Sequence, residues 1–199
     1  MTVKIILVLI AGVLTGFFFL EPSFYPITGT LLDLGLCLLL FFVGIDIGNN
    51  KNTFLHLKKL GFKIILVPIS AAIGGIIGGM MIAAIFGMPV FEGAAVAAGF
   101  GWYSLAPLII APYSAELSTI AFLTNVFKEI FAIIFIPFVA KKIGFFEAVA
   151  MGGATAMDTT LPIITRNTDG ETAVVSFLSG LIMTLMVPVL VPIFISLLG

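Results

Sequence analysis

Long apolar runs separated by short polar connections dominate this sequence. A helix that spans a membrane needs about 20 mostly apolar residues, and five runs meet that requirement: 3–20, 30–48, 62–86, 116–140 and 172–198. Two further apolar segments, 91–111 and 146–165, are long enough but are interrupted by glycine and proline. Such interruptions are tolerated at membrane depth where the freed backbone groups face protein or a water-filled cavity. The pattern predicts an all-α polytopic membrane protein.

The two interrupted segments belong to an internal repeat. A shift of 55 residues, without a gap, places Glu92 on Glu147, Pro107 on Pro162 and Glu116 on Glu171. Prolines and glutamates are rare in this chain, so their common spacing is informative. We therefore expect a three-helix N-terminal segment over 1–90 and two units over 91–140 and 146–199, each an interrupted segment followed by a spanning helix.

The basic residues indicate how the interrupted segments run. Cytoplasmic loops collect Lys and Arg, which puts the 49–63 loop and the N-terminus inside. If segment 91–111 dips into the membrane and returns, Lys141, Lys142 and Arg166 also lie inside. Each unit then crosses the membrane once, and the two units are inverted. The prediction is five spanning helices plus two re-entrant hairpins in an inverted repeat, the design of a secondary transporter, with the C-terminus outside.

Composition agrees with a membrane protein and narrows the function. The 199 residues are 61% hydrophobic and 10% charged, whereas soluble domains carry about 25% charged residues. The net charge of −1 does not suggest nucleic acid as a partner. The sequence offers neither a cluster of metal-ligand residues nor a nucleophile–base pair, so we expect no cofactor, no metal and no enzyme activity.

Three polar residues lie at the centre of the predicted helix 116–140. Lys128 and Glu129 are far from both membrane surfaces, where charges are costly and usually functional. Asn125 lies one turn before Glu129 on the same face. The alternative is a structural ion pair that holds the bundle together, although such a pair is an expensive way to pack helices.

The stretch "MGGATAMDTTLPI" (151–163) places Asp158 at the tip of the second predicted hairpin, with Thr155 and Thr159 beside it. A fixed negative charge there can hold an ammonium group or a proton, and the alternative role is an N-cap for the returning half-helix. The first hairpin has Trp102, Tyr103 and Ser104 at the matching positions. These aromatic rings either cover a cation or simply pack.

Asp46, in "FFVGIDIGNN", lies near the cytoplasmic end of its helix. An acid is readily solvated at that depth. Asp46 is therefore either a boundary residue or part of an inner proton path.

The motifs "GFGWYSLAP", "KEIFAIIFIP", "GGATAMDTTLPIITR" and "LLLFFVGIDIGNN" together resemble the lysine exporter LysO family along almost the whole chain. The resemblance implies export of L-lysine and toxic analogues such as thialysine across the bacterial or archaeal inner membrane, driven by inward proton movement. It also implies that transport depends on intramembrane acids, which carry over to Glu129 and Asp158. Typical members have an additional helix block before the region that matches residue 1. The missing helices would come from a small membrane partner, or the chain would self-associate.

From these features we expect Ser104, Thr155 or Thr159 and the hairpin-tip backbone to hold the carboxylate and α-amino group of lysine. Its ε-ammonium would lie near Asp158 and Glu129, and protonation of Glu129 from outside would release it. We expect Lys128 to occupy the cation site when substrate is absent. Two other functions fit the same pattern: a cation/proton (Na⁺/H⁺) antiporter, and a non-transporting membrane subunit of a larger complex.

Overall fold

A computed structural model of the chain describes residues 63–198 and, before them, only positions 11, 12, 14–18, 27, 34, 38, 45 and 61. The chain divides into two compact units, Met1–Asp46 and Ile47–Gly199. Asp46, most of the predicted helices 3–20 and 30–48, and nearly all of the basic loop at 49–63 fall outside the described residues. The architecture that follows is that of residues 63–198.

Three long helices have the length and composition needed to cross a membrane: α4 (Lys63–Ile85), α7 (Ala115–Lys142) and α10 (Gly170–Ser196). Their bounds agree within two residues with the runs predicted over 62–86, 116–140 and 172–198. All the regular elements of residues 63–198 are helical. The prediction of an all-α membrane protein is confirmed for this part of the chain.

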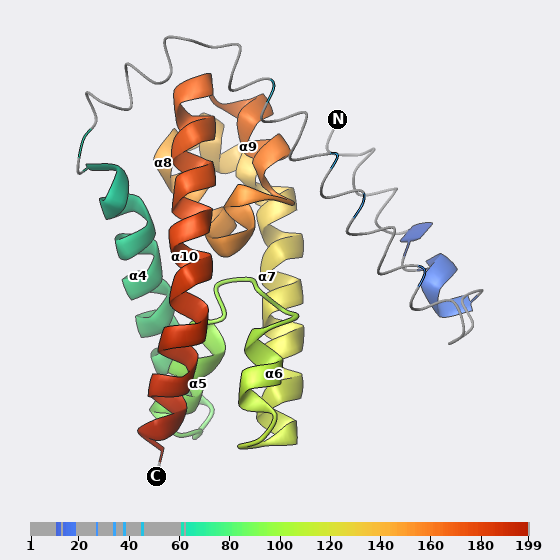
Figure 1. Cartoon of the computed structure of the whole chain (residues 1–199), viewed down its shortest axis with the longest axis vertical. Coiled ribbons are helices and arrows are strands. Elements are labelled where there is room, and N and C mark those ends of the chain that lie inside the picture. The colour runs from blue at the N-terminus through green and yellow to red at the C-terminus, as the bar shows by residue number, and fades with distance from the viewer. Residues whose placement is uncertain are drawn as a thin grey trace. The chain divides into compact units, whose positions relative to one another are not determined.

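Two interrupted segments lie between the long helices. The first consists of α5 (Val90–Ala97), a turn and α6 (Ala106–Ile110). The second consists of α8 (Phe145–Gly152), the 3₁₀ helix η2 (Gly153–Met157) and α9 (Leu161–Asn167). Figure 1 shows that each segment enters the bundle from one end, turns about halfway along it and returns to the same end, the two from opposite ends.

The helices follow the 55-residue repeat closely. A shift of 55 places α5 on α8, the start of α6 on the start of α9, and the start of α7 on the start of α10. Even the caps correspond, since Ser114 accepts a hydrogen bond from the backbone N–H of Leu117 and Asp169 accepts one from Thr172. In Figure 1 α7 and α10 run in opposite directions, so the two copies are inverted relative to one another.

Close backbone contacts join α4 to the first segment, because a Cβ added at Gly79 or Gly93 would overlap the other helix. The C-terminal helix α10 is the central element, packed against α4, α5, α6, α8, α9 and η2. α7 packs against both interrupted segments. The turns of both segments therefore lie between α7 and α10.

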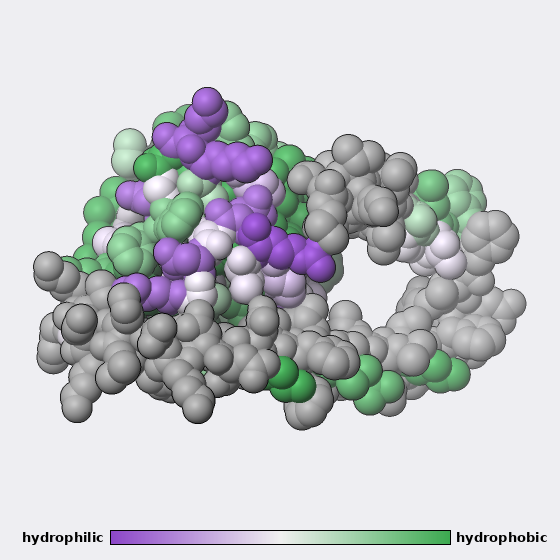
Figure 2. Space-filling model, turned by 90° about the horizontal axis from the view of Figure 1, so that it is seen from above, coloured by the Kyte–Doolittle hydropathy of each residue, from purple (hydrophilic) through white to green (hydrophobic). Residues whose placement is uncertain are grey.

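Hydrophilic residues gather at one end of the bundle. Figure 2 views the end where α7 finishes and α10 begins, and hydrophilic residues cover much of its described surface. Residues at this end include Lys141 and Lys142 in the last turn of α7, Arg166 in the last turn of α9, and Asp169 at the N-cap of α10. Of the basic residues that the sequence predicted on one side, Lys141, Lys142 and Arg166 therefore share one end of the bundle.

Candidate functional site

The turns of the two segments meet inside the bundle. We call residues 98–105 the first tip and residues 153–160 the second tip. The backbone N–H of Ala154 donates a hydrogen bond to the carbonyl oxygen of Phe100 over 2.9 Å, which joins the tips directly. Phe100 has a φ of 49°, a left-handed conformation that costs roughly 1–3 kcal/mol in a residue with a side chain. Burial of its ring, which is 2% exposed, helps to hold it there.

Asn125 of α7 anchors the first tip. Its side-chain oxygen accepts a hydrogen bond from the backbone N–H of Gly101 over 2.7 Å. Its amide nitrogen donates to the carbonyl oxygens of Ala121 at 2.8 Å and Val96 at 3.4 Å. Asn125 is 2% exposed, so the structure places it as a support for the tip backbone and away from the surface.

Lys128 of α7 bridges the two tips. Its Nζ donates hydrogen bonds to the carbonyl oxygen of Phe100 at 3.1 Å, Gly152 at 3.0 Å and Met151 at 3.4 Å. The ammonium group is therefore held by backbone carbonyls, and Glu129 interacts with it only electrostatically in the part of the chain that the structure describes. These contacts differ from two expectations drawn from the sequence. One was a structural ion pair between Lys128 and Glu129, and the other was a Lys128 ammonium group placed beside the carboxylates of the cation site.

Glu129 and Asp158 form a second polar group. The two carboxylates interact electrostatically with one another, and the hydroxyl of Thr159 reaches Glu129. Tyr103 of the first tip interacts electrostatically with both acids, and its ring packs edge-on against Phe122 with centroids 6.3 Å apart. The structure thus brings together four of the residues singled out in the sequence, one or more from each repeat. Their roles stay a prediction.

Asp158 does not cap the returning half-helix with its side chain. The N-cap of α9 is Thr160, and no N-cap side chain accepts a hydrogen bond from the first backbone N–H groups of that helix. The carboxylate instead accepts hydrogen bonds from the backbone N–H and the hydroxyl of Thr159. The capping alternative is therefore not what the structure shows, and the charge-bearing role of Asp158 stays a prediction.

The other predicted site residues occupy different surroundings. Thr155 is 6% exposed, and its hydroxyl donates to the carbonyl of Gly152 over 2.9 Å. Ser104 is exposed. Trp102 is partly buried and packs against the hydrophobic core. Thr155 and Trp102 therefore build the tips, and Ser104 lies on the surface of the first one.

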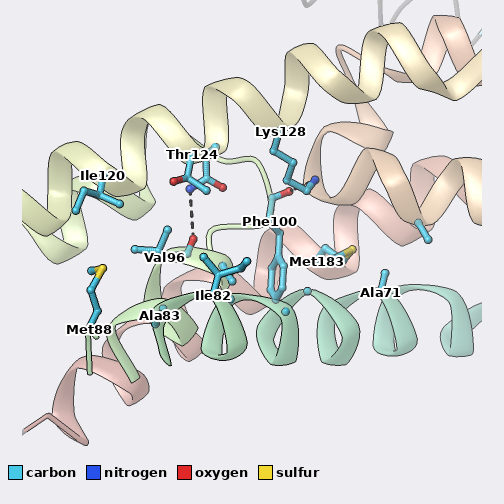
Figure 3. Close-up of a pocket in the computed structure, with 17 residues that line it drawn as sticks. Ala71, Ile82, Ala83, Met88, Val96, Phe100, Ile120, Thr124, Lys128 and Met183 are labelled. Carbon is cyan, nitrogen blue, oxygen red and sulfur yellow. Dashed lines mark hydrogen bonds between the residues drawn. The ribbon is translucent and has the colours of Figure 1, made fainter. Parts of the chain in front are cut away.

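A cleft of about 320 Å³ lies between α4, α5 and α7 and reaches Lys128. Glycines of α4 and α5 line one side, and Ile120, Thr124, Asn125 and Lys128 of α7 line the other. Figure 3 shows Phe100 and Lys128 together in this cleft, with Met88 some distance along it. The sequence did not predict the cleft or the carbonyl oxygens around Lys128. The sequence signal for these contacts was limited to glycines, which let backbone segments approach one another closely. They are the glycines on either side of Phe100 and the pair Gly152-Gly153.

Comparison with known proteins identifies the family. Residues 6–195 match the sequence profile of a family described as lysine exporter LysO. The chain belongs to the LysO family. This match confirms the resemblance seen in the motifs. The family is one of transporters, and helices of spanning length mark this LysO chain as a membrane protein.

Two relatives are similar over most of the chain. "Lysine exporter LysO" of Escherichia coli (strain K12) is 32% identical over 160 residues, which cover 80% of this chain and 53% of the relative. "Putative lysine exporter" of Haemophilus influenzae is 32% identical over 166 residues, which cover 81% of this chain and 82% of the relative. The matched part thus spans about half of the first relative. No solved structure matches the chain.

Proposed function

We propose that this LysO chain takes part in export of L-lysine, and of analogues such as thialysine, by secondary active transport with proton antiport. The observation that carries the proposal is that Glu129 and Asp158, one acid from each repeat, interact electrostatically beside the two tips and that Thr159 interacts with both of them. Ionisable groups at membrane depth usually lie on substrate or proton pathways. The names of both relatives describe lysine exporters.

We further propose that the two interrupted segments are re-entrant hairpins in a cytoplasmic membrane, with the N-terminus inside and the C-terminus outside. Lys141, Lys142 and Arg166 at one end of the bundle support this orientation, since basic residues favour the cytoplasmic side. Tips that end inside the bundle are typical of transporters in which discontinuous helices form the substrate site.

In the proposed mechanism the ε-ammonium of lysine binds between Glu129 and Asp158. Tyr103 covers its aliphatic stem, and the polar groups of Ser104 and Thr159 meet the carboxylate and α-amino group. Protons that enter from outside neutralise one or both acids and release the cation. Neutral carboxyl groups no longer attract an ammonium, which is the physical basis of the exchange.

Efflux from proteoliposomes tests this proposal. Vesicles loaded with labelled lysine and containing the wild-type chain should release label faster when a proton gradient is imposed, and Glu129→Gln or Asp158→Asn should reduce release to that of empty vesicles. Thr119→Ala, on an exposed hydroxyl of the same helix, serves as a control that keeps wild-type release. Wild-type release from both acid variants would refute the mechanism.

The same vesicles separate lysine export from Na⁺/H⁺ antiport. A sodium gradient should neither drive nor inhibit lysine release, and proton movement should require lysine. Proton movement that depends on Na⁺ and occurs without lysine would favour the antiporter.

We propose that a small membrane partner, or a second copy of the chain, completes the transporter. The matched region covers only 53% of the Escherichia coli relative. Lysine efflux from cells that express the chain with and without the neighbouring reading frame tests this. Equal efflux in the two strains, with a monomer in detergent, would contradict both forms of the proposal.

A further inference from the structure

The surroundings of the Lys128 ammonium resemble a cation-binding site. An ammonium group has three N–H donors and no acceptor, and Nζ has three carbonyl acceptors, from Phe100 in the first tip and from Met151 and Gly152 at the end of α8. The carbonyls at the end of a helix carry partial negative charge. The three oxygens therefore form a site for a positive charge.

The distances are those of an ammonium group and are longer than those of a Ca²⁺ site. The three N–O separations are 3.0, 3.1 and 3.4 Å. The two shorter ones are those of ordinary N–H···O hydrogen bonds, and all three exceed the roughly 2.3–2.6 Å at which Ca²⁺ holds its oxygen ligands. The site has the dimensions of a primary ammonium.

Two glycines make room for this site. Gly153 has a φ of 66°, and a Cβ added there would overlap both Lys128 Nζ and the carbonyl oxygen of Phe100. Gly101 has a φ of 104°, and a Cβ there would lie 3.4 Å from Nζ. Both tips thus present bare backbone to the same cation.

We propose that the carbonyl oxygens of Phe100, Met151 and Gly152 form a monovalent-cation site shared by the two tips, and that Lys128 fills it as a covalently attached cation. In transporters with broken helices, exposed carbonyls of this kind coordinate a free ion. Here the side chain supplies the charge, so the tips are held together without Na⁺. When the side chain is removed, a small primary ammonium ion can enter the site through the adjoining cleft.

This inference rests on the described contacts and does not depend on lysine export. Trp102, the single tryptophan of the chain, lies two residues after Phe100 in the first tip. Its fluorescence therefore reports on the tip in purified full-length protein. No transport measurement is needed.

The experiment compares wild type, Lys128→Ala and Lys128→Met, each purified in parallel in methylammonium chloride and in tetramethylammonium chloride at equal ionic strength. Tetramethylammonium has the same charge but no N–H donor and is bulkier. Methionine fills the space of the lysine side chain without its charge, as Met183 does at the matching position of α10.

We expect the Trp102 emission of Lys128→Ala to differ from wild type in tetramethylammonium, and to return towards wild type as methylammonium is added, with saturation. Wild type should respond to neither salt, and Lys128→Met should show the altered emission in both. NaCl should restore Lys128→Ala less well than methylammonium at the same concentration.

Recovery of folded Lys128→Ala only in methylammonium also supports the proposal. Equal recovery or equal emission in the two salts, failure to recover Lys128→Ala in either, or wild-type emission from Lys128→Ala would overturn it. None of these results depends on which substrate the chain transports.

Discussion

The two repeats follow the same path through the bundle but carry different chemistry. In α7, Asn125, Lys128 and Glu129 face the tips; in α10 the residues 55 positions later are Gly180, Met183 and Thr184. Met183 is 2% exposed and belongs to the hydrophobic core. At these positions α7 thus carries an amide and two charges, whereas α10 carries a glycine, a core methionine and a neutral hydroxyl. The repeat preserves backbone geometry and leaves the side chains free to diverge.

The tips are also held in different ways. The first is hydrogen-bonded to the side chain of Asn125. The second packs directly on Gly180, where an added Cβ would overlap the backbone of Met157, and its Ala156 carbonyl also accepts a hydrogen bond from Ser176 of α10. The two acids also come from different repeats: Glu129 lies on the long helix of the first repeat, and Asp158 lies in the tip of the second. A site that needs both acids therefore forms only when the two repeats fold together.

We expect the largest difference in lysine release between substitutions of Asp158 and of Tyr103, which occupy matching positions in the two tips. Asp158→Asn keeps the shape of the side chain and removes the charge, so lysine release from proteoliposomes should fall to background. Tyr103→Phe removes only a hydroxyl and should leave most of the release intact. Similar losses in the two variants would show that the two tips contribute alike.

Met183→Lys places a lysine at the buried position of α10 that matches Lys128 of α7. A buried charge without a partner costs about 3–5 kcal/mol, so thermal unfolding of the purified variant should begin far below that of wild type. Met183→Leu conserves volume and should cost less than about 1.5 kcal/mol. Equal melting temperatures for the two variants would mean that α10 tolerates a lysine at this buried position.

Asn125→Ala removes the side chain that anchors the first tip. The backbone N–H of Gly101 then loses its acceptor, at a cost of about 1–3 kcal/mol. Thermal unfolding should detect this loss, together with a change in Trp102 emission. Thr124→Ala, at the neighbouring exposed position, is the matched control, and a loss as large as that of Asn125→Ala would argue against the anchor.

The smallest effect should come from two serines that hold the interrupted segments. Ser176 donates to the carbonyl of Ala156 over 2.7 Å, and Ser118 donates to that of Pro107 over 2.8 Å. Hydrogen bonds between membrane helices contribute about 0.6 kcal/mol on average. Ser176 is fully buried, so Ser176→Ala should lower the melting temperature more than Ser118→Ala. The reverse order would place the stronger restraint on the first segment.

Much of the fold was predictable because its signals are local or periodic. The apolar runs gave the bounds of α4, α7 and α10 within two residues, since helix length in a membrane is set by hydrophobic thickness. Pro107 and Pro162, 55 residues apart, marked the starts of the two returning half-helices. Glu129 and Asp158 were recognisable as candidate site residues because acids are rare in apolar segments. Asp46 and the first two predicted spans remain predictions outside the described residues.

The surroundings of each polar side chain were not predictable in the same way. The sequence suggested that Asn125 and Glu129 share a helix face. In the structure Asn125 supports the first tip, whereas Glu129 interacts with Thr159 and, electrostatically, with Asp158. Thr155 was one of three candidates to bind substrate, and the sequence did not predict that its hydroxyl donates to the carbonyl of Gly152. A spacing of three or four residues predicts which side chains share a helix face, but it does not predict which loop packs against that face.

The sequence by itself determined that this is a helical membrane protein of the LysO family, with two related units and acids at unusual depth. Only the tertiary structure decided that the two tips meet and that the carbonyl oxygens of Phe100, Met151 and Gly152 converge on Lys128. Every residue carries the same backbone carbonyl, so a site built from carbonyls has no residue signature in the sequence. It exists only where folding brings separate stretches of backbone together.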